Sequence, residues 1–195
     1  MGDELSYLKS ELMDVVTNVK VNNPVASIKL GSVFYRDQGD LYVTRRSGFS
    51  SDFSVTNDFI NNQEPGGGGD FPEAVEIAVN EALNDLQWTE DATTKIMFLI
   101  LDAPPHHEPQ IIANLQNSLT FASSKGIKII PITASGIDKE TEFLMRFMAI
   151  ATNGTYVFIT DHSGIGESHL EASVGQYDVE FLNDLMSRLI NKYAE

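Results

Sequence analysis

The sequence contains no cysteine among its 195 residues, and it has only 13 lysines and arginines against 28 aspartates and glutamates. Without cysteine there is no disulfide, no thiol nucleophile and no thiolate metal site. The formal net charge of −15 repels nucleic acid and anionic membranes and attracts cations or basic surfaces, so we expect no nucleic-acid partner.

Long apolar runs are absent as well. No stretch is long enough to span a bilayer, so we expect no membrane segment, and no signal peptide precedes the first predicted helix. The lack of cysteine leaves the compartment open, and an extracellular or cell-envelope location is favoured.

The residues that are present favour one globular α/β domain over 1–195, since 42% are hydrophobic and 9% aromatic. Helical and strand periodicities alternate along the chain. We expect one mostly parallel, doubly wound sheet with helices on both faces, built from Ile28–Phe34, Lys95–Leu101, Ile127–Thr133 and Tyr156–Ile159, with Leu41–Thr44 as an antiparallel edge strand. Helices are predicted over 3–22, 55–61, 74–86, 109–126, 138–153 and 179–193.

The apolar run that begins after Lys95 ends at Asp102, which Ala103 and two prolines follow. Such a run is typical of a strand buried on both faces of a parallel sheet. Ligands of open α/β sheets bind just beyond the carboxyl ends of the strands, so Asp102 is a candidate for metal binding or chemistry. The alternative is that Asp102 caps the helix that follows.

Four consecutive glycines, Gly66–Gly69, precede Asp70. A glycine-rich loop that opens a helix has the geometry of an anion cradle. The chain has no Lys-Ser/Thr pair after the glycines, and Glu64 and Asp70 repel phosphate, which argues against a phosphate site. Asp70 therefore has two interpretations: a cation ligand, or the first residue of a capping box with Glu73.

The spacing of the histidines does not match the His-Glu-x-x-His pattern of zinc proteases. His106 and His107 are adjacent and point apart, so we expect them to be solvated at the start of a helix, with a zinc site as the minor alternative. His162 and His169 lie in a long loop that we interpret as a polar lid or, alternatively, a surface metal site. No nucleophile-elbow pattern is present.

Three segments together resemble a von Willebrand factor A domain. They are Ser32–Asp37 with Tyr42–Arg45, the Gly66–Ala74 loop, and Phe98–His106. The resemblance is to the branch in which Gly-Gly-Gly-Asp-x-Pro-Glu replaces Gly-Gly-Thr and Asp-Ala-Pro-Pro-His replaces Thr-Asp-Gly. It implies a Rossmann-like fold with a metal-ion-dependent adhesion site, where Mg²⁺ or Mn²⁺ is held at the top of the sheet and a partner's carboxylate completes its shell.

The resemblance also implies which residues form the site. The metal ligands are Asp102 and Asp70, or the backbone at Gly69, and the ligand-binding surface includes Asp3, Gly68 and His106. Mg²⁺ prefers oxygen ligands and keeps several waters, so these carboxylates suit it, but two of them alone hold it weakly. The implied partner is a protein that binds through an acidic residue.

One part of the family pattern is missing. The Asp-x-Ser/Thr-x-Ser motif and its strand do not occur, and Met1–Leu5 resembles the residues that follow that motif. The missing strand would lie between Ile28–Phe34 and Lys95–Leu101, so we expect a slot there. Upstream residues fill it in our preferred interpretation; the alternatives are direct pairing of the flanking strands and insertion of a strand from another copy. We expect weak Mg²⁺ binding by this chain alone and tight binding by an extended one.

These observations favour a non-enzymatic protein-binding module of the adhesion type. The alternatives are an Mg²⁺-dependent α/β enzyme acting on a phosphorylated substrate, and a structural domain without metal. Phosphoryl transfer needs lysine or arginine near the site to offset charge, and none occurs between Glu64 and Glu90. The oligomeric state stays open.

Overall fold

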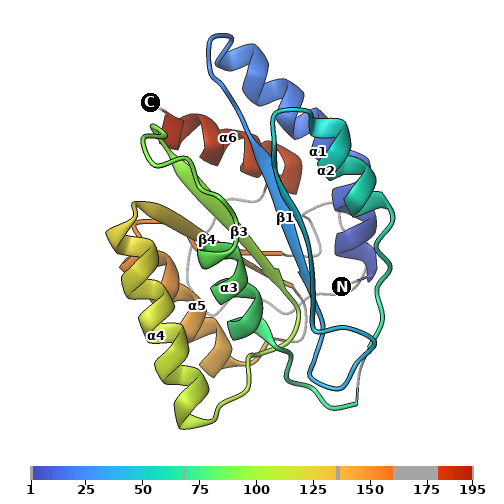
Figure 1. Ribbon diagram of the computed structural model, residues 1–195, viewed down its shortest axis with the longest axis vertical. Helices are drawn as coiled ribbons and strands as arrows, with labels where there is room; N and C mark the ends of the chain where they lie inside the picture. Colours follow the sequence, from blue (N-terminus) through green and yellow to red (C-terminus); the bar gives the residue numbers. More distant parts are fainter. Residues whose placement is uncertain (1, 68, 135–136, 160–179, 195) are drawn as a thin grey trace.

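The computed structural model describes residues 2–67, 69–134, 137–159 and 180–194, and Figure 1 shows their arrangement. The elements are α1 (Gly2–Asn22), β1 (Leu30–Tyr35), β2 (Thr44–Ser50), α2 (Phe53–Asn61), α3 (Val75–Asn84), β3 (Lys95–Leu101), α4 (Pro109–Ser124), β4 (Ile127–Thr133), α5 (Lys139–Ala151), β5 (Val157–Phe158) and α6 (Leu182–Ala194).

A parallel sheet with the strand order β3-β4-β5 forms the centre of the fold. Its strands are apolar on both faces because helices cover both, as the sequence predicts. On one face Ile127 and Ile129 of β4 pack with side chains of α3, α4 and α5. On the other face Ile130 and Ile132 pack with side chains of α1 and α6. The fold is therefore α/β, with two apolar layers around the sheet.

β1 and β2 form a separate antiparallel pair, in which Tyr35 lies opposite Thr44. Leu30 and Phe34 of β1 pack against a small core of α1 and α2 side chains. The predicted second strand, Leu41–Thr44, is wrong, because β2 is Thr44–Ser50. Its polar sequence lacks an apolar face, and strand pairing with β1 decides its conformation instead.

The start of the first strand also differs from the prediction. The sequence predicts this strand over Ile28–Phe34, but β1 is Leu30–Tyr35. Lys29 is exposed, so burial does not favour strand pairing there. β5, Val157–Phe158, is likewise shorter than the predicted Tyr156–Ile159.

The sequence predicts one continuous sheet, but the structure divides the strands between two sheets. Among the described residues β1 pairs as a strand only with β2, and β3 pairs as a strand only with β4. Direct pairing of β1 with β3, one of the expected ways to close the slot, does not occur in this part of the chain. A side chain joins the two strands instead: the Tyr35 hydroxyl donates to the Ile100 carbonyl oxygen at 3.2 Å. Filling of the slot by upstream residues or by another copy stays a prediction.

Local sequence signals correctly predict where α4 and α5 begin and where α4 ends. Asp138 caps α5, where its carboxylate accepts a hydrogen bond from the Thr141 amide at 2.7 Å, as predicted. Pro109 opens α4, and Gly126, with φ of 67°, follows its end. None of the helices in the described part of the chain is long and apolar enough to cross a membrane.

Candidate functional site

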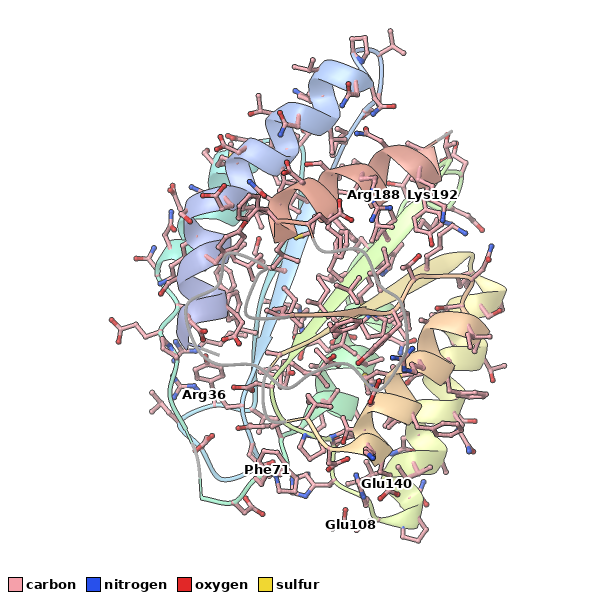
Figure 2. The ribbon with its side chains drawn as sticks, turned by 180° about the vertical axis from the view of Figure 1, so that it is seen from behind. Arg36, Phe71, Glu108, Glu140, Arg188 and Lys192 are labelled. Atoms are coloured by element: carbon pink, nitrogen blue, oxygen red, sulfur yellow. The ribbon has the colours of Figure 1, made fainter. Side chains whose placement is uncertain are left out.

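Three loops meet beyond the carboxyl end of β3, and we call them the edge loops: residues 36–43, residues 62–67 with 69–74, and residues 102–108. The Arg36 guanidinium donates to the Glu64 carbonyl oxygen at 3.0 Å, which joins the first two loops. The Glu73 amide donates to the Pro104 carbonyl oxygen at 2.9 Å, which joins the second and third. Figure 2 shows Arg36, Phe71 and Glu108 along this edge of the molecule.

Acidic side chains from all three loops surround Glu73. Burial and the negative charges of Asp37, Asp40, Asp102 and Asp70, in that order, raise the pKa of Glu73 to about 7. The buried Oε2 atom of Glu73 has no hydrogen-bond partner. We call these five residues the carboxylate cluster, and their mutual repulsion favours a bound cation or a partner's positive group.

A histidine–aspartate pair connects the first and third loops. His106 Nε2 lies 2.8 Å from Asp37 Oδ1, and both side chains are mostly buried. The hydrogen bond with Asp37 raises the pKa of His106 above its ordinary value, and the charges of Asp37, Glu108 and Glu76 add to this. Burial pushes the pKa of Asp37 upward, but hydrogen bonds from His106 and the Gln38 backbone outweigh it and leave that pKa lowered. The predicted solvated role of His106 is therefore wrong.

Glu76 adds a buried carboxyl in the first turn of α3. Its side chain is only 6% exposed, and its Oε2 atom has no hydrogen-bond partner. Burial raises the pKa of Glu76, while the nearby charge of His106 lowers it. The sequence analysis did not identify Glu76, Asp37 or Asp40 as site residues.

The structure rejects both capping interpretations. Glu108 is the N-cap residue of α4, so Asp102 does not cap that helix. Ala74 is the N-cap residue of α3 and makes no side-chain cap hydrogen bond, so Asp70 and Glu73 form no capping box. The physical reason is that the Glu73 amide is already bonded to Pro104, which holds residue 73 beside the third loop and starts the helix after it.

The other predicted site residues occupy different positions. Gly69 is exposed, and nothing lies within 4 Å of where its Cβ would be, while Gly68 is outside the described residues. Asp3 is in the first turn of α1, where a hydrogen bond with Glu4 is the main cause of its lowered pKa. The start of α1 lies beside the second loop, because a Cβ on Gly2 would be 3.8 Å from Pro65 Cγ.

The cluster matches a divalent cation in charge and ligand type, since all its groups are carboxylates. Within residues 2–67, 69–134, 137–159 and 180–194, however, no three histidine, aspartate or glutamate side chains are arranged to hold a metal ion. Coordination of one shared ion by Asp70 and Asp102 therefore stays a prediction. His162 and His169, with the lid or metal site predicted for them, lie outside the described residues.

Beside the acidic groups lies a basic and aromatic patch that sequence reasoning missed. The guanidinium carbons of Arg36 and Arg45 lie 4.5 and 4.1 Å from the centroid of the Tyr42 ring. Leu41 and Phe71 in the same edge loops are 81% and 52% exposed. The sequence analysis searched for basic residues only between Glu64 and Glu90. Arg36 lies outside that range, and the β1–β2 hairpin brings its side chain to the Glu64 backbone.

Comparison with known proteins supports the fold. No protein-family profile matches the chain. A putative ariadne-like RING finger protein, R811, of Acanthamoeba polyphaga mimivirus is 33% identical over 108 residues, which are 55% of this chain and 10% of that protein. The crystal structure of the conserved hypothetical protein BatB from Bacteroides thetaiotaomicron superposes with a TM-score of 0.59 at 15% identity, covering 97% of this chain and 88% of that one. The chain thus has an α/β fold similar to that of BatB.

Proposed function

We propose that this chain is a non-enzymatic protein-binding module that engages its partner through the edge loops, with Mg²⁺ or Mn²⁺ assisting. The observation that supports the proposal best is the carboxylate cluster, in which burial and the charges of four aspartates raise the pKa of Glu73 to about 7. Such a concentration of negative charge at the carboxyl end of a parallel strand is well placed to hold a cation.

In this proposal Asp70 and Asp102 hold the cation, directly or through water, and Glu73 and Asp37 supply further negative charge around it. The bound cation offers a positive site to which an acidic side chain of the partner can bind. His106 keeps Asp37 in place through their 2.8 Å contact, so the first loop stays next to the third.

The neighbouring patch suits the same kind of partner. Arg45, stacked on Tyr42, offers its guanidinium group to a carboxylate, and stacking on the ring pre-orders it for bidentate contact. Exposed Leu41 and Phe71 add apolar contact area. A partner segment with an acidic residue flanked by apolar residues complements this surface, whereas a polyanion is repelled by the net charge of −15.

The enzyme alternative receives less support from this arrangement. Phosphoryl transfer requires positive groups to offset developing charge. Arg36 and Lys9 are bonded to the second edge loop, and both are already engaged. The Arg36 guanidinium donates to the Glu64 carbonyl oxygen and stacks on Tyr42, and the Lys9 ammonium donates to the Gln63 carbonyl oxygen. The alternative of a structural domain without metal predicts no cation response at the edge loops.

Mn²⁺ titration followed by amide NMR tests the cation site directly, because the ion broadens only signals close to it. We expect selective broadening at residues 37, 70, 73 and 102, reversal by excess Mg²⁺, and loss in Asp102→Asn. The control is Asp91→Asn, an exposed aspartate before β3, at the opposite end of that strand. Uniform broadening, or an unchanged response in Asp102→Asn, would contradict the site.

Selection from a displayed library of random peptides tests the binding function. With Mg²⁺ present we expect enriched peptides to carry an acidic residue next to apolar ones, and EDTA or Arg45→Gln to weaken their binding. Para-nitrophenyl phosphate is the probe for the enzyme alternative. Mg²⁺-dependent turnover that Asp102→Asn abolishes would replace the binding module with a phosphatase-type enzyme.

A further inference from the structure

One member of the carboxylate cluster, Asp40, has no role in the cation site proposed above. It lies in the turn of the hairpin between β1 and β2, where its Oδ2 atom accepts a hydrogen bond from the Asp37 amide at 3.2 Å. The Asp40 amide donates to the Asp37 carbonyl oxygen at 3.3 Å. These two bonds fix the Asp40 carboxylate relative to the backbone of the first edge loop.

The same carboxylate lies directly against the backbone of the second edge loop at Gly67. A Cβ on Gly67 would be 3.0 Å from Asp40 Cγ and 3.3 Å from Asp40 Oδ1, and it would be closer still to Asp40 Oδ2. Gly67 also has a φ of 109°, a conformation that L side chains rarely adopt. Any other residue at position 67 would therefore have to displace either the Asp40 side chain or the loop.

A second hairpin side chain covers the neighbouring glycine in the same way. A Cβ on Gly66 would be 3.1 Å from Arg36 Nη2, and this nitrogen donates to the Glu64 carbonyl oxygen. Gly69, by contrast, has nothing within 4 Å of its Cβ position. The hairpin thus packs on residues 66 and 67 of the glycine run and leaves Gly69 open. Figure 1 shows the hairpin and the loop before α3 at the same end of the molecule.

We propose that Asp40 is a positioning residue for the cation site: its carboxylate, packed on Gly67, holds the glycine loop against the hairpin and so brings Asp70 to the other edge loops. Asp70 follows Gly67 by three residues, so a displacement of the loop at Gly67 also moves Asp70. This inference rests on the proposed function, because it assigns Asp40 a role in that same site.

Two physical reasons make such a contact necessary. A glycine run has little conformational preference of its own, so it does not hold Asp70 in one place. The carboxylates of the cluster also repel one another, which pushes the loops apart. Asp70 nevertheless lies close enough to Asp37 for their hydrogen bond to contribute to the lowered pKa of Asp37. Asp40 acts through Asp70 in this arrangement, because its own Oδ2 atom is engaged by the Asp37 amide.

The Mn²⁺ titration by amide NMR described above, applied to variants of the full chain, tests this role. Gly67→Ala keeps all five carboxylates but removes the room for Asp40, and it should weaken Mn²⁺ binding at residues 70 and 102 by about tenfold or more. Asp40→Gly should weaken binding to a similar extent. Adding Gly67→Ala to Asp40→Gly should then change the affinity by less than about twofold, because the two residues no longer conflict.

Two further variants separate the contact from backbone strain and from charge. Gly126→Ala is the control for strain, since Gly126 has a φ of 67° and nothing within 4 Å of its Cβ position, and it follows α4. It should leave Mn²⁺ binding unchanged. Asp40→Asn keeps the shape of the side chain and an oxygen acceptor for the Asp37 amide, so it should bind Mn²⁺ within about threefold of the unaltered chain.

Gly67→Ala that binds Mn²⁺ as tightly as the unaltered chain, or that weakens binding equally with Asp and Gly at position 40, would overturn the proposal. So would equal losses in Asp40→Asn and Asp40→Gly, a comparison that stays valid if Gly67→Ala loses helix content in circular dichroism.

Metal-free spectra distinguish this proposal from the proposed function. Gly67→Ala should shift the amide signals of residues 37 and 70 without any metal, and Asp40→Gly should remove that effect. If the unaltered chain shows no Mn²⁺ broadening, the cation site fails and the role of Asp40 fails with it, whereas Mn²⁺ binding without this metal-free coupling overturns the role of Asp40 alone.

Discussion

The Tyr35 hydroxyl in β1 donates a hydrogen bond to the Ile100 carbonyl oxygen in β3 over 3.2 Å. In the described residues no ladder of backbone bonds joins these strands, because β1 and β3 belong to different sheets. The tyrosine side chain therefore satisfies a strand-edge acceptor that a neighbouring strand satisfies in a continuous sheet. Burial and the charges of Asp102 and Glu73 raise the pKa of Tyr35, so its hydroxyl keeps the proton that it donates.

Replacing Tyr35 with phenylalanine should destabilise the fold by about 1 kcal/mol, since it removes one hydrogen bond and leaves the Ile100 acceptor unpaired. Urea denaturation followed by circular dichroism measures the free energy of unfolding. Tyr42→Phe is the matched control, because the ring of Tyr42 contacts two guanidiniums that phenylalanine also attracts. Equal stability of both variants would show that the Tyr35–Ile100 bond contributes nothing.

The His106–Asp37 pair should give the fold a pH-dependent stability. His106 has a raised pKa, so its contribution is fully present below the ordinary value of 6.5 and is lost as the pH rises through the folded value. Asp37 has a lowered pKa, so its contribution is present above 3.8 and is lost as the pH falls through the folded value. The pair stabilises the fold most between about pH 4 and 6.5.

His106→Gln tests this, because glutamine keeps a neutral donor but cannot become charged. We expect a loss on the order of 1 kcal/mol at pH 5.5 that shrinks toward zero at pH 9. Thermal unfolding across that pH range provides the measurement, with His107→Gln, an exposed neighbour, as the control. A loss that stays constant with pH would mean that the His106 charge has no role.

The Glu73 carboxylate should destabilise the fold at alkaline pH. Its pKa rises from 4.5 to about 7, so the folded state retains a proton that the unfolded state releases, and stability falls as the pH increases through this interval. After allowance for solvent screening, Glu73→Gln should stabilise the protein by about 1 kcal/mol at pH 8 and by little at pH 4.5. Glu64→Gln, which removes an exposed charge from the same loop, should show no inflection near pH 7.

Gly154 should tolerate no side chain. A Cβ at this position would lie 2.0 Å from the Ile129 carbonyl oxygen, a backbone atom of β4. We expect Gly154→Ala to reduce the free energy of unfolding by about 2 kcal/mol or more, because the chain after α5 must move away from β4. Gly48→Ala is the control, since nothing lies within 4 Å of its Cβ position, and it should be close to neutral in denaturant unfolding.

The sequence alone determined the elements whose signals are local. β3 and β4 occur at the predicted residues because unbroken apolar runs of strand length need no distant information. The start of α5 after Asp138 was predictable because an N-cap acts within a few residues. The position of β2 was not predictable from the sequence, because most of its side chains are polar and only pairing with β1 makes it a strand.

Only the tertiary structure decided how the site is assembled. Asp37 and His106 are separated by 69 residues in sequence, and no periodicity relates them. The same holds for Glu73, whose pKa depends on charges from three loops, and for the division of the strands into two sheets. These features arise where chain segments distant in sequence meet, since Coulomb interactions and hydrogen bonds depend on distance in space and not along the chain.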